Sequence, residues 1–294
     1  MNQADHGHDV TQRITRWAMM DDAVRAVLLT SSRTNSNAPL DALSDHDVIL
    51  YVADADRFEA QDRWLTEFGA VLVQFREPRT HDGMPEYSRL VLYADGTKID
   101  FTIISIEHLR LVANAAALPD YLDVGYSVLV DKDRLTGTLS EPTYRAHIPT
   151  KPTPEEYRAL VEEFWWETTY VAKNLWRDEL MQARYCLDSV MRYDLLRRML
   201  EWYAEIGREW SWKPGVLGRG LKGALPTEIW SALEETFADA SIEANWRALF
   251  QMTALFTQVA GTVATGLGYE YPQELDTGVT RYLEKIRQMA RDGT

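Results

Sequence analysis

A proline-rich segment near the middle of the chain constrains the fold more than any other feature of the sequence. Residues 141–154 contain four prolines, at positions 142, 149, 152 and 154. Proline has a fixed φ and no amide hydrogen, so a segment of this kind continues neither a helix nor a central strand. We therefore predict a linker here and two domains, residues 1–145 and residues 146–294.

The part before the linker alternates short β-rich runs with helical ones. Strands are predicted over residues 24–30, 46–53, 70–75, 87–93, 98–105 and 127–130. Asp95-Gly96 lies between two of these runs and indicates a tight hairpin. Residues 56–68 have the spacing of one amphipathic helix. Residues 76–85 hold two prolines and a glycine, so we expect a loop there.

The part after the linker has the patterns of helices. Thr153 can cap a helix that starts with Pro154, and Glu156 completes a capping box. Long helical patterns cover residues 154–173, 177–206, 227–237, 242–266 and 272–291. The predicted fold class is α+β, with a mixed β-sheet flanked by helices in the first domain and an all-α helical bundle in the second.

Composition limits the partners and the compartment. The 294 residues carry a formal charge of −14, which repels nucleic acid and attracts cationic small molecules, although such a charge also simply favours solubility. No apolar run reaches the roughly 20 residues that cross a bilayer. The first residues lack an apolar signal segment, so we expect a cytoplasmic protein without a membrane or nucleic-acid partner. Cys186 is the only cysteine, which excludes an internal disulfide, and its apolar neighbours predict a buried thiol.

Three aspartates in β-rich runs are the main candidates for chemistry. Asp45 and Asp47 flank the start of the second predicted strand, and strand alternation puts both on one face. Asp100 lies inside the predicted strand over residues 98–105. Two carboxylates about 4 Å apart repel by roughly 4 kcal/mol at an effective dielectric near 20. A cation between them would offset this repulsion. Oxygen ligands without cysteine favour Mg²⁺.

A polar loop, Ser31-Ser32-Arg33, ends the first predicted strand close to these acids. Its amides and the Ser32 hydroxyl are suited to holding phosphates. The combination predicts metal-dependent phosphoryl or nucleotidyl transfer from a nucleoside triphosphate, with Asp45 and Asp47 as metal ligands. Asp100 would complete the acidic triad, as a third candidate metal ligand, and accept the proton of an acceptor hydroxyl. The alternative for the Asp-x-Asp pair alone is a solvated turn.

Several motifs resemble one known family. Residues 32–39, Ser-Arg-Thr-Asn-Ser-Asn-Ala-Pro, with Asp41 and then Asp45-His46-Asp47, resemble the nucleotidyltransferase signature of aminoglycoside 6-adenylyltransferases. The similarity continues through residues 98–102, 163–166, 169–173, 175–180, 199–203 and 271–272. The resemblance implies transfer of AMP from ATP to the 6-hydroxyl of streptomycin, an aminoglycoside antibiotic, with Mg²⁺ and release of pyrophosphate. It also implies a role in antibiotic resistance.

The loop departs from the family pattern at one position. The family usually has Gly-Ser where this chain has Ser31-Ser32. Glycine permits a positive φ and a close approach of the backbone to phosphate. Serine is tolerated at 31 if its φ is negative; otherwise we expect weaker triphosphate binding. One alternative is therefore a catalytically weakened homologue that binds nucleotide or drug. A separate alternative is the same transfer to a different aminoglycoside or to a protein hydroxyl.

A cationic acceptor needs carboxylates and aromatic faces. The helical part offers both, in residues Glu163, Trp166, Glu167, Trp176 and Asp178. The first three are spaced three and four apart, so they share a helix face. The family resemblance implies that Lys173 contacts the triphosphate. The alternatives are that the tryptophans fill a core and that the charged residues face water. The oligomeric state does not follow from the sequence.

Overall fold

The computed structural model describes residues 3–35, 40–81 and 84–289, and the chain divides into two units, Met1–Ala146 and His147–Thr294. The first unit is built on a β-sheet whose described strands number six. They are β1 (Val24–Thr30), β2 (His46–Val52), β3 (Val71–His81), β4 (Met84–Tyr93), β5 (Lys98–Ser105) and β6 (Tyr126–Asp131). The helices and 3₁₀ turns are α1 (Gln3–Met20), η1 (Ser31–Thr34), α2 (Ala55–Ala60), η2 (Arg63–Phe68), α3 (Ile106–Ala113), α4 (Asp120–Asp123) and η3 (Thr136–Thr138).

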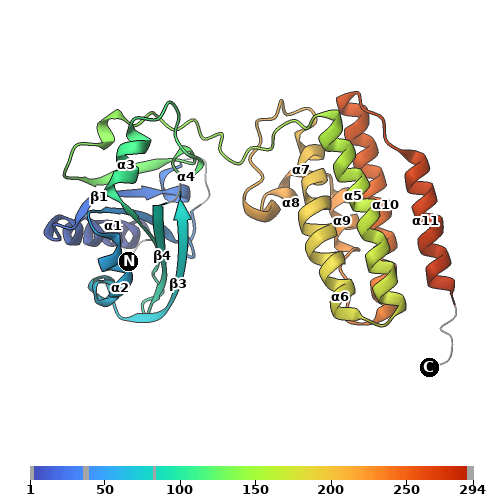
Figure 1. Ribbon diagram of the computed structural model, residues 1–294, viewed down its shortest axis with the longest axis horizontal. Coiled ribbons are helices and arrows are strands. Elements are labelled where there is room, and N and C mark those ends of the chain that lie inside the picture. Colours follow the sequence, from blue (N-terminus) through green and yellow to red (C-terminus); the bar gives the residue numbers. More distant parts are fainter. Residues whose placement is uncertain (1–2, 36–39, 82–83, 290–294) are drawn as a thin grey trace. The chain divides into compact units, whose positions relative to one another are not determined.

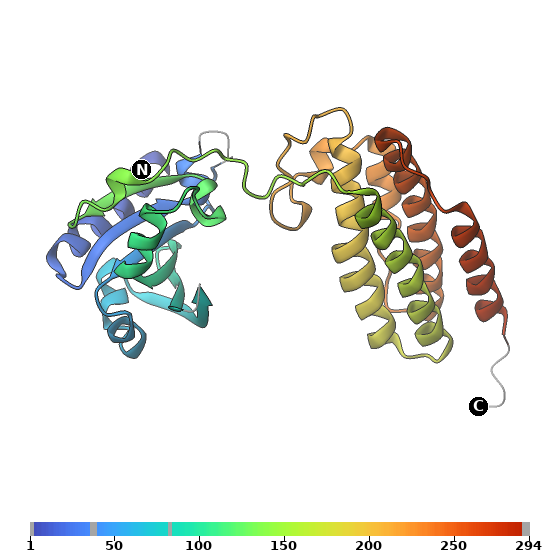
Figure 2. The same cartoon turned by 45° about the horizontal axis from the view of Figure 1, so that its top comes forward.

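The sheet is mixed, as predicted. Its order is β3-β4-β5-β2-β1-β6, with β2 and β5 parallel and the other neighbours antiparallel. Alternate side chains of the strands enter two apolar cores on opposite faces. Helix α1, with α2 and η2, covers one face, and α3 covers part of the other (Figures 1 and 2).

Two sequence predictions for this unit are wrong. Residues 76–81 and 84–85 are not a loop but the continuation of β3 and β4, which pair up to His81 and Met84; residues 82–83 lie outside the described part. β3 is an edge strand, where a proline such as Pro78 removes no ladder hydrogen bond that the sheet requires. The single helix expected over residues 56–68 is split, because the backbone is extended at Gln61 between α2 and η2.

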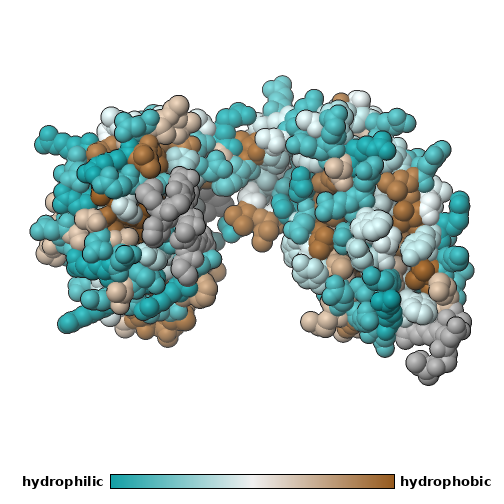
Figure 3. All heavy atoms as spheres, viewed as in Figure 1, coloured by the Kyte–Doolittle hydropathy of each residue, from teal (hydrophilic) through white to brown (hydrophobic). Residues whose placement is uncertain are grey.

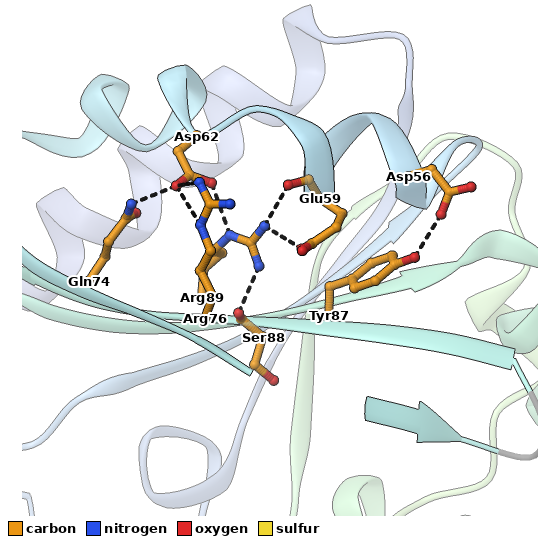
Figure 4. A network of polar contacts seen from close by, with 8 residues as sticks. All are labelled: Asp56, Glu59, Asp62, Gln74, Arg76, Tyr87, Ser88 and Arg89. Carbon is orange, nitrogen blue, oxygen red and sulfur yellow. Dashed lines mark hydrogen bonds and ion pairs between the residues drawn. The ribbon is translucent and has the colours of Figure 1, made fainter. Parts of the chain in front are cut away.

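An ionic network explains that split and fixes the β3–β4 hairpin (Figure 4). The fully buried guanidinium of Arg89 donates to Glu59 and, at 3.0 Å, to Asp62, which follows α2. Asp62 also accepts from Gln74 at 2.6 Å and from Arg76. Although burial alone would raise it, these hydrogen bonds hold the pKa of Asp62 below its usual value.

The second unit is helical, as predicted. Its elements are α5 (Pro154–Trp176), α6 (Leu180–Arg184), the π-helical stretch η4 (Tyr185–Leu196), α7 (Arg197–Glu205), η5 (Val216–Gly218), α8 (Leu221–Ala224), α9 (Thr227–Glu234), α10 (Ile242–Leu267) and α11 (Gln273–Gln288). The predicted capping box is confirmed: the Glu156 amide donates to the Thr153 hydroxyl, and the Thr153 amide donates to the Glu156 carboxylate. These helices enclose a separate apolar core, which includes Trp165 and the buried Cys186.

The helix expected over residues 177–206 is interrupted at its start. Residues 177–179 form a turn in which Asp178 has a φ of +67°, and α6 begins only at Leu180. Among the described residues, no helix is both long and apolar enough to cross a bilayer. Hydrophilic side chains predominate on the face drawn in Figure 3, and apolar ones form scattered patches.

Candidate active site

The register of the sheet brings the three aspartates together. Asp47 of β2 is directly opposite Asp100 of the parallel strand β5, and Asp45 comes two residues before Asp47. Directly opposite residues project to the same side of a sheet. This is the face that α3 covers farther along the strands, where Ile49 and Ile104 enter the apolar core. The acids therefore lie on the same face of the sheet as that core.

Lys98 belongs to the same cluster, although the sequence analysis gave it no role. Its ammonium lies 2.8 Å from a carboxylate oxygen of Asp45 and 3.2 Å from one of Asp100. The hydrogen bond to Asp45 is the main reason why the pKa of Lys98 is raised. The signal was available, because Lys98 is two residues before Asp100 and must face the same side of the strand.

The electrostatics of the cluster favour a bound cation. Burial, followed by the charges of Asp45 and Asp100, raises the pKa of Asp47 to about 6. Burial likewise raises the pKa of Asp100, in spite of Lys98. One carboxylate oxygen of Asp100 is buried and has no hydrogen-bond partner among the described residues. Ionised carboxylates in this arrangement need more positive charge than a single ammonium supplies.

The grouping and the donor atoms of these residues decide whether a divalent metal fits here. Among the described residues, no three His, Cys, Asp or Glu side chains are already grouped to hold one, and the ammonium of Lys98 is the cation between Asp45 and Asp100. The donors are all carboxylate oxygens, one of them without a hydrogen-bond partner in the described chain. Such a donor set fits a hard cation such as Mg²⁺.

The loop next to the acids is η1, which follows β1. Thr30 is opposite Asp47, so Ser31 comes directly after that position, and its side-chain hydroxyl lowers the pKa of the Asp47 carboxyl. The φ of Ser31 is +65°, so the condition under which serine would be tolerated, a negative φ, is not met. The position thus has the conformation for which glycine is best suited, and serine holds it at a cost of roughly 1–2 kcal/mol.

Arg33 holds the backbone in front of the acids. Its guanidinium donates to the carbonyl of Ser44 at 2.6 Å and to that of Asp45 at 2.7 Å. Burial lowers the pKa of Arg33 although the charges of Asp45 and Asp47 oppose this. Ser32 lies between these two loop residues and is partly buried. Residues 36–39 of the motif lie outside the described part.

The helical unit brings together four of the residues expected to contact substrates. Glu163, Trp166, Glu167 and Lys173 all lie on α5, and the Trp166 side chain is 62% exposed. Burial and then the charge of Glu163 raise the pKa of Glu167. Tyr170, for which no role was expected from the sequence, contacts both Trp166 and Lys173.

Tyr170 makes contacts on both sides along α5. Its ring is in an edge contact with Trp166 at 6.1 Å, and the Lys173 ammonium lies 4.5 Å from its centre. The other two expected residues are placed differently. Trp176 is the last residue of α5, and its indole N–H donates to the carbonyl of Met289; Asp178 lies beyond the end of α5 in the turn before α6.

Comparisons with known proteins show the family to which the chain belongs. The family model described as streptomycin adenylyltransferase matches residues 6–286. An aminoglycoside 6-adenylyltransferase of Bacillus subtilis (strain 168) is 32% identical over 276 residues, which cover 92% of this chain and 94% of that protein. An aminoglycoside 6-adenylyltransferase of Campylobacter jejuni is 32% identical over 97% of this chain and 96% of that protein. A crystal structure of an aminoglycoside 6-adenyltransferase from Bacillus subtilis aligns over 96% of this chain and 97% of that one, with 27% identity and a TM-score of 0.47.

Proposed function

The chain belongs to the streptomycin adenylyltransferase family and is a nucleotidyltransferase, and from this premise we propose that it transfers AMP from ATP to a hydroxyl group of an aminoglycoside. We propose the 6-hydroxyl of streptomycin as the acceptor. The observation that carries the proposal is the pairing of Asp47 with Asp100, beside Asp45, at the end of β1 where the Ser31 loop begins.

The reaction assigns a separate task to each part of this cluster. The acceptor oxygen forms a bond to the α-phosphorus of ATP, and the bond from that phosphorus to the bridging oxygen breaks, releasing pyrophosphate. Asp100 accepts the proton of the hydroxyl, a task that its raised pKa favours. Asp45 and Asp47 would hold Mg²⁺, which when bound supplies the charge that neutralises the phosphates.

The loop and α5 would bind the two substrates. We assign the triphosphate to the amides and hydroxyls of Ser31 and Ser32, and we propose Arg33 and Lys173 as the cations that bind it. On α5, Glu163 and Glu167 offer carboxylates and Trp166 an exposed aromatic face. Carboxylates and aromatic faces are the groups that bind guanidinium and ammonium ions.

A direct assay tests the proposal. The protein is incubated with ATP labelled at the α-phosphorus, Mg²⁺ and streptomycin, and transfer of label and release of pyrophosphate are both followed. A panel of other aminoglycosides identifies the preferred acceptor, and NMR of the product identifies the modified hydroxyl. Wild-type protein that binds ATP but labels no aminoglycoside would refute the proposed activity.

The strained conformation of Ser31 favours one second candidate, a homologue that binds nucleotide or drug but turns over poorly. Tight binding of ATP without release of pyrophosphate would support this candidate. In that case, a gain of activity in the Ser31→Gly variant would identify the loop as the cause.

A further inference from the structure

The row of residues that contains the catalytic acids continues onto the two strands at the edge of the sheet. Asp100 of β5 is directly opposite Leu90 of β4, and Leu90 is directly opposite Phe75 of β3. Since Asp47 is opposite Asp100, these four side chains form one line on one face of the sheet.

The neighbouring row has the same character. Lys98, which contacts two of the acids, is opposite Leu92, and Leu92 is opposite Val73. Phe75 is 60% exposed and Val73 is 57% exposed, while Leu90 and Leu92 are half-buried. We call the four side chains Val73, Phe75, Leu90 and Leu92 the apolar shelf. The shelf begins directly beside Asp100 and Lys98.

The other face of the same hairpin confirms the direction of these side chains (Figure 4). Gln74, Arg76 and Arg89 all point toward Asp62, on the side of α2 and η2. Strand alternation therefore turns Phe75 and Leu90 to the opposite side, which is the side of the acids. Because the buried Arg89 fixes the hairpin, the shelf is in place before any ligand binds.

The chemistry of transfer determines which substrate lies over the shelf. The Ser31 loop follows β1, on the far side of Asp47 from β5, so the departing pyrophosphate lies toward β1. The attacking and leaving oxygens are roughly in line through the α-phosphorus. The acceptor must then approach from the side of β4 and β3. We propose that the apolar shelf is the floor of the acceptor subsite, an inference that rests on the proposed function.

The shelf suits an aminoglycoside in particular. A sugar or cyclitol ring has an apolar C–H face that can lie on Leu90 and Phe75, and a cationic substituent can lie over the Phe75 ring. The carboxylates of Asp100 and Asp45 border the shelf on one side. Binding sites for small molecules commonly combine an apolar wall with a few polar groups in this way.

Kinetics of the Phe75→Ala variant test the assignment. We expect the KM for the aminoglycoside to rise roughly tenfold, because an aromatic contact is lost, while the KM for ATP stays unchanged. Phe75→Trp should restore most of the affinity. Leu111→Ala on α3 is the matched control, since Leu111 is also 60% exposed but lies outside the acid row. Binding of streptomycin is measured separately by calorimetry, with a non-hydrolysable ATP analogue present.

Three outcomes would overturn the assignment. A rise in the KM for ATP alone would indicate that the shelf binds the nucleobase of ATP. If both KM values stay unchanged and Phe75→Ala abolishes a concentration-dependent dimer, the shelf binds a second copy of the chain through the exposed edge strand. Unchanged constants in a monomer would leave the shelf without this role. Wild-type protein that neither binds nor modifies any aminoglycoside refutes the proposed function first, and the shelf falls with it.

Discussion

Asp47 is the residue at which stability and activity oppose each other most clearly. Its pKa is raised to about 6, mainly by burial, against roughly 3.9 in an unfolded chain. Between these two values the folded protein binds a proton more tightly than the unfolded one. Without metal, the contribution of Asp47 to stability is therefore most favourable at low pH, and it declines as the pH rises through about 4 to 6.

The Asp47→Asn variant should separate the two effects. We expect transfer to fall by at least about a hundredfold, because a charged ligand is lost. The free energy of unfolding at pH 8 in metal-free buffer should rise, by up to about 3 kcal/mol, because the buried charge of Asp47 itself is removed. Calorimetry measures the second effect, and Glu67→Gln, an exposed acid in η2, serves as the control. A large loss of stability would instead mean that Asp47 is structural.

Ser31 offers a second test at this scale. Its hydroxyl lowers the pKa of Asp47, so Ser31→Gly should raise that pKa and move the acidic limb of the kcat/KM profile to higher pH. Stability should change by less than about 1 kcal/mol, because relief of the positive φ is offset by the greater freedom of unfolded glycine. Ser32→Gly is the control for the stability measurement, since Ser32 has no positive φ. An acidic limb that stays in place would contradict the role of the hydroxyl.

At the scale of elements, the β3–β4 hairpin depends on one buried cation. Replacing Arg89 by methionine leaves Glu59 and Asp62 short of positive charge, so we expect a loss of about 3 kcal/mol in the free energy of unfolding. Arg76→Met is a matched control, because Arg76 binds the same Asp62 from a half-exposed position and should cost under about 1 kcal/mol. Equal losses in urea denaturation of the two variants would contradict this reasoning.

The same hairpin shows where reasoning from the sequence succeeds and where it ends. Alternating apolar runs and Asp95-Gly96 predicted β4, β5 and their turn, because these signals are local. The extension of β3 and β4 was missed because prolines usually end strands; Pro78 is tolerated on the edge strand β3, and an edge position is a property of the whole sheet. The break between α2 and η2 was missed for a related reason. Asp62 is bound there by an arginine from a distant strand.

The candidate site was predictable to a similar degree. Asp45, Asp47 and Asp100 could be singled out because acids in apolar strands are unusual, and the register brings them together. The positive φ of Ser31 and the use of Arg33 to hold the backbone of Ser44 depend on contacts between segments. Such contacts leave no local pattern in the sequence.

At the scale of the whole molecule, the charge of −14 should assist the binding of a cationic acceptor. Salt screens such long-range attraction, with a Debye length near 10 Å at 0.1 M and about 3 Å at 1 M. We expect the KM for the aminoglycoside to rise several-fold as potassium chloride is increased through this range. The KM for ATP should not rise in parallel, because the anion is repelled by the same field. A parallel rise in both constants would indicate a general loss of activity in salt.

The order of strands also affects how the protein is made. β1 lies between β2, which follows it closely, and β6, so that Ala26 pairs with Asp131. On the ribosome, the sheet thus stays incomplete until nearly all of the first unit has emerged, and Asp47 must wait for β5 before it meets Asp100. Pairings between distant segments form slowly. Throughout that interval the nascent chain exposes apolar strands such as β1 and β2, which makes it a natural client for chaperones that bind emerging polypeptides.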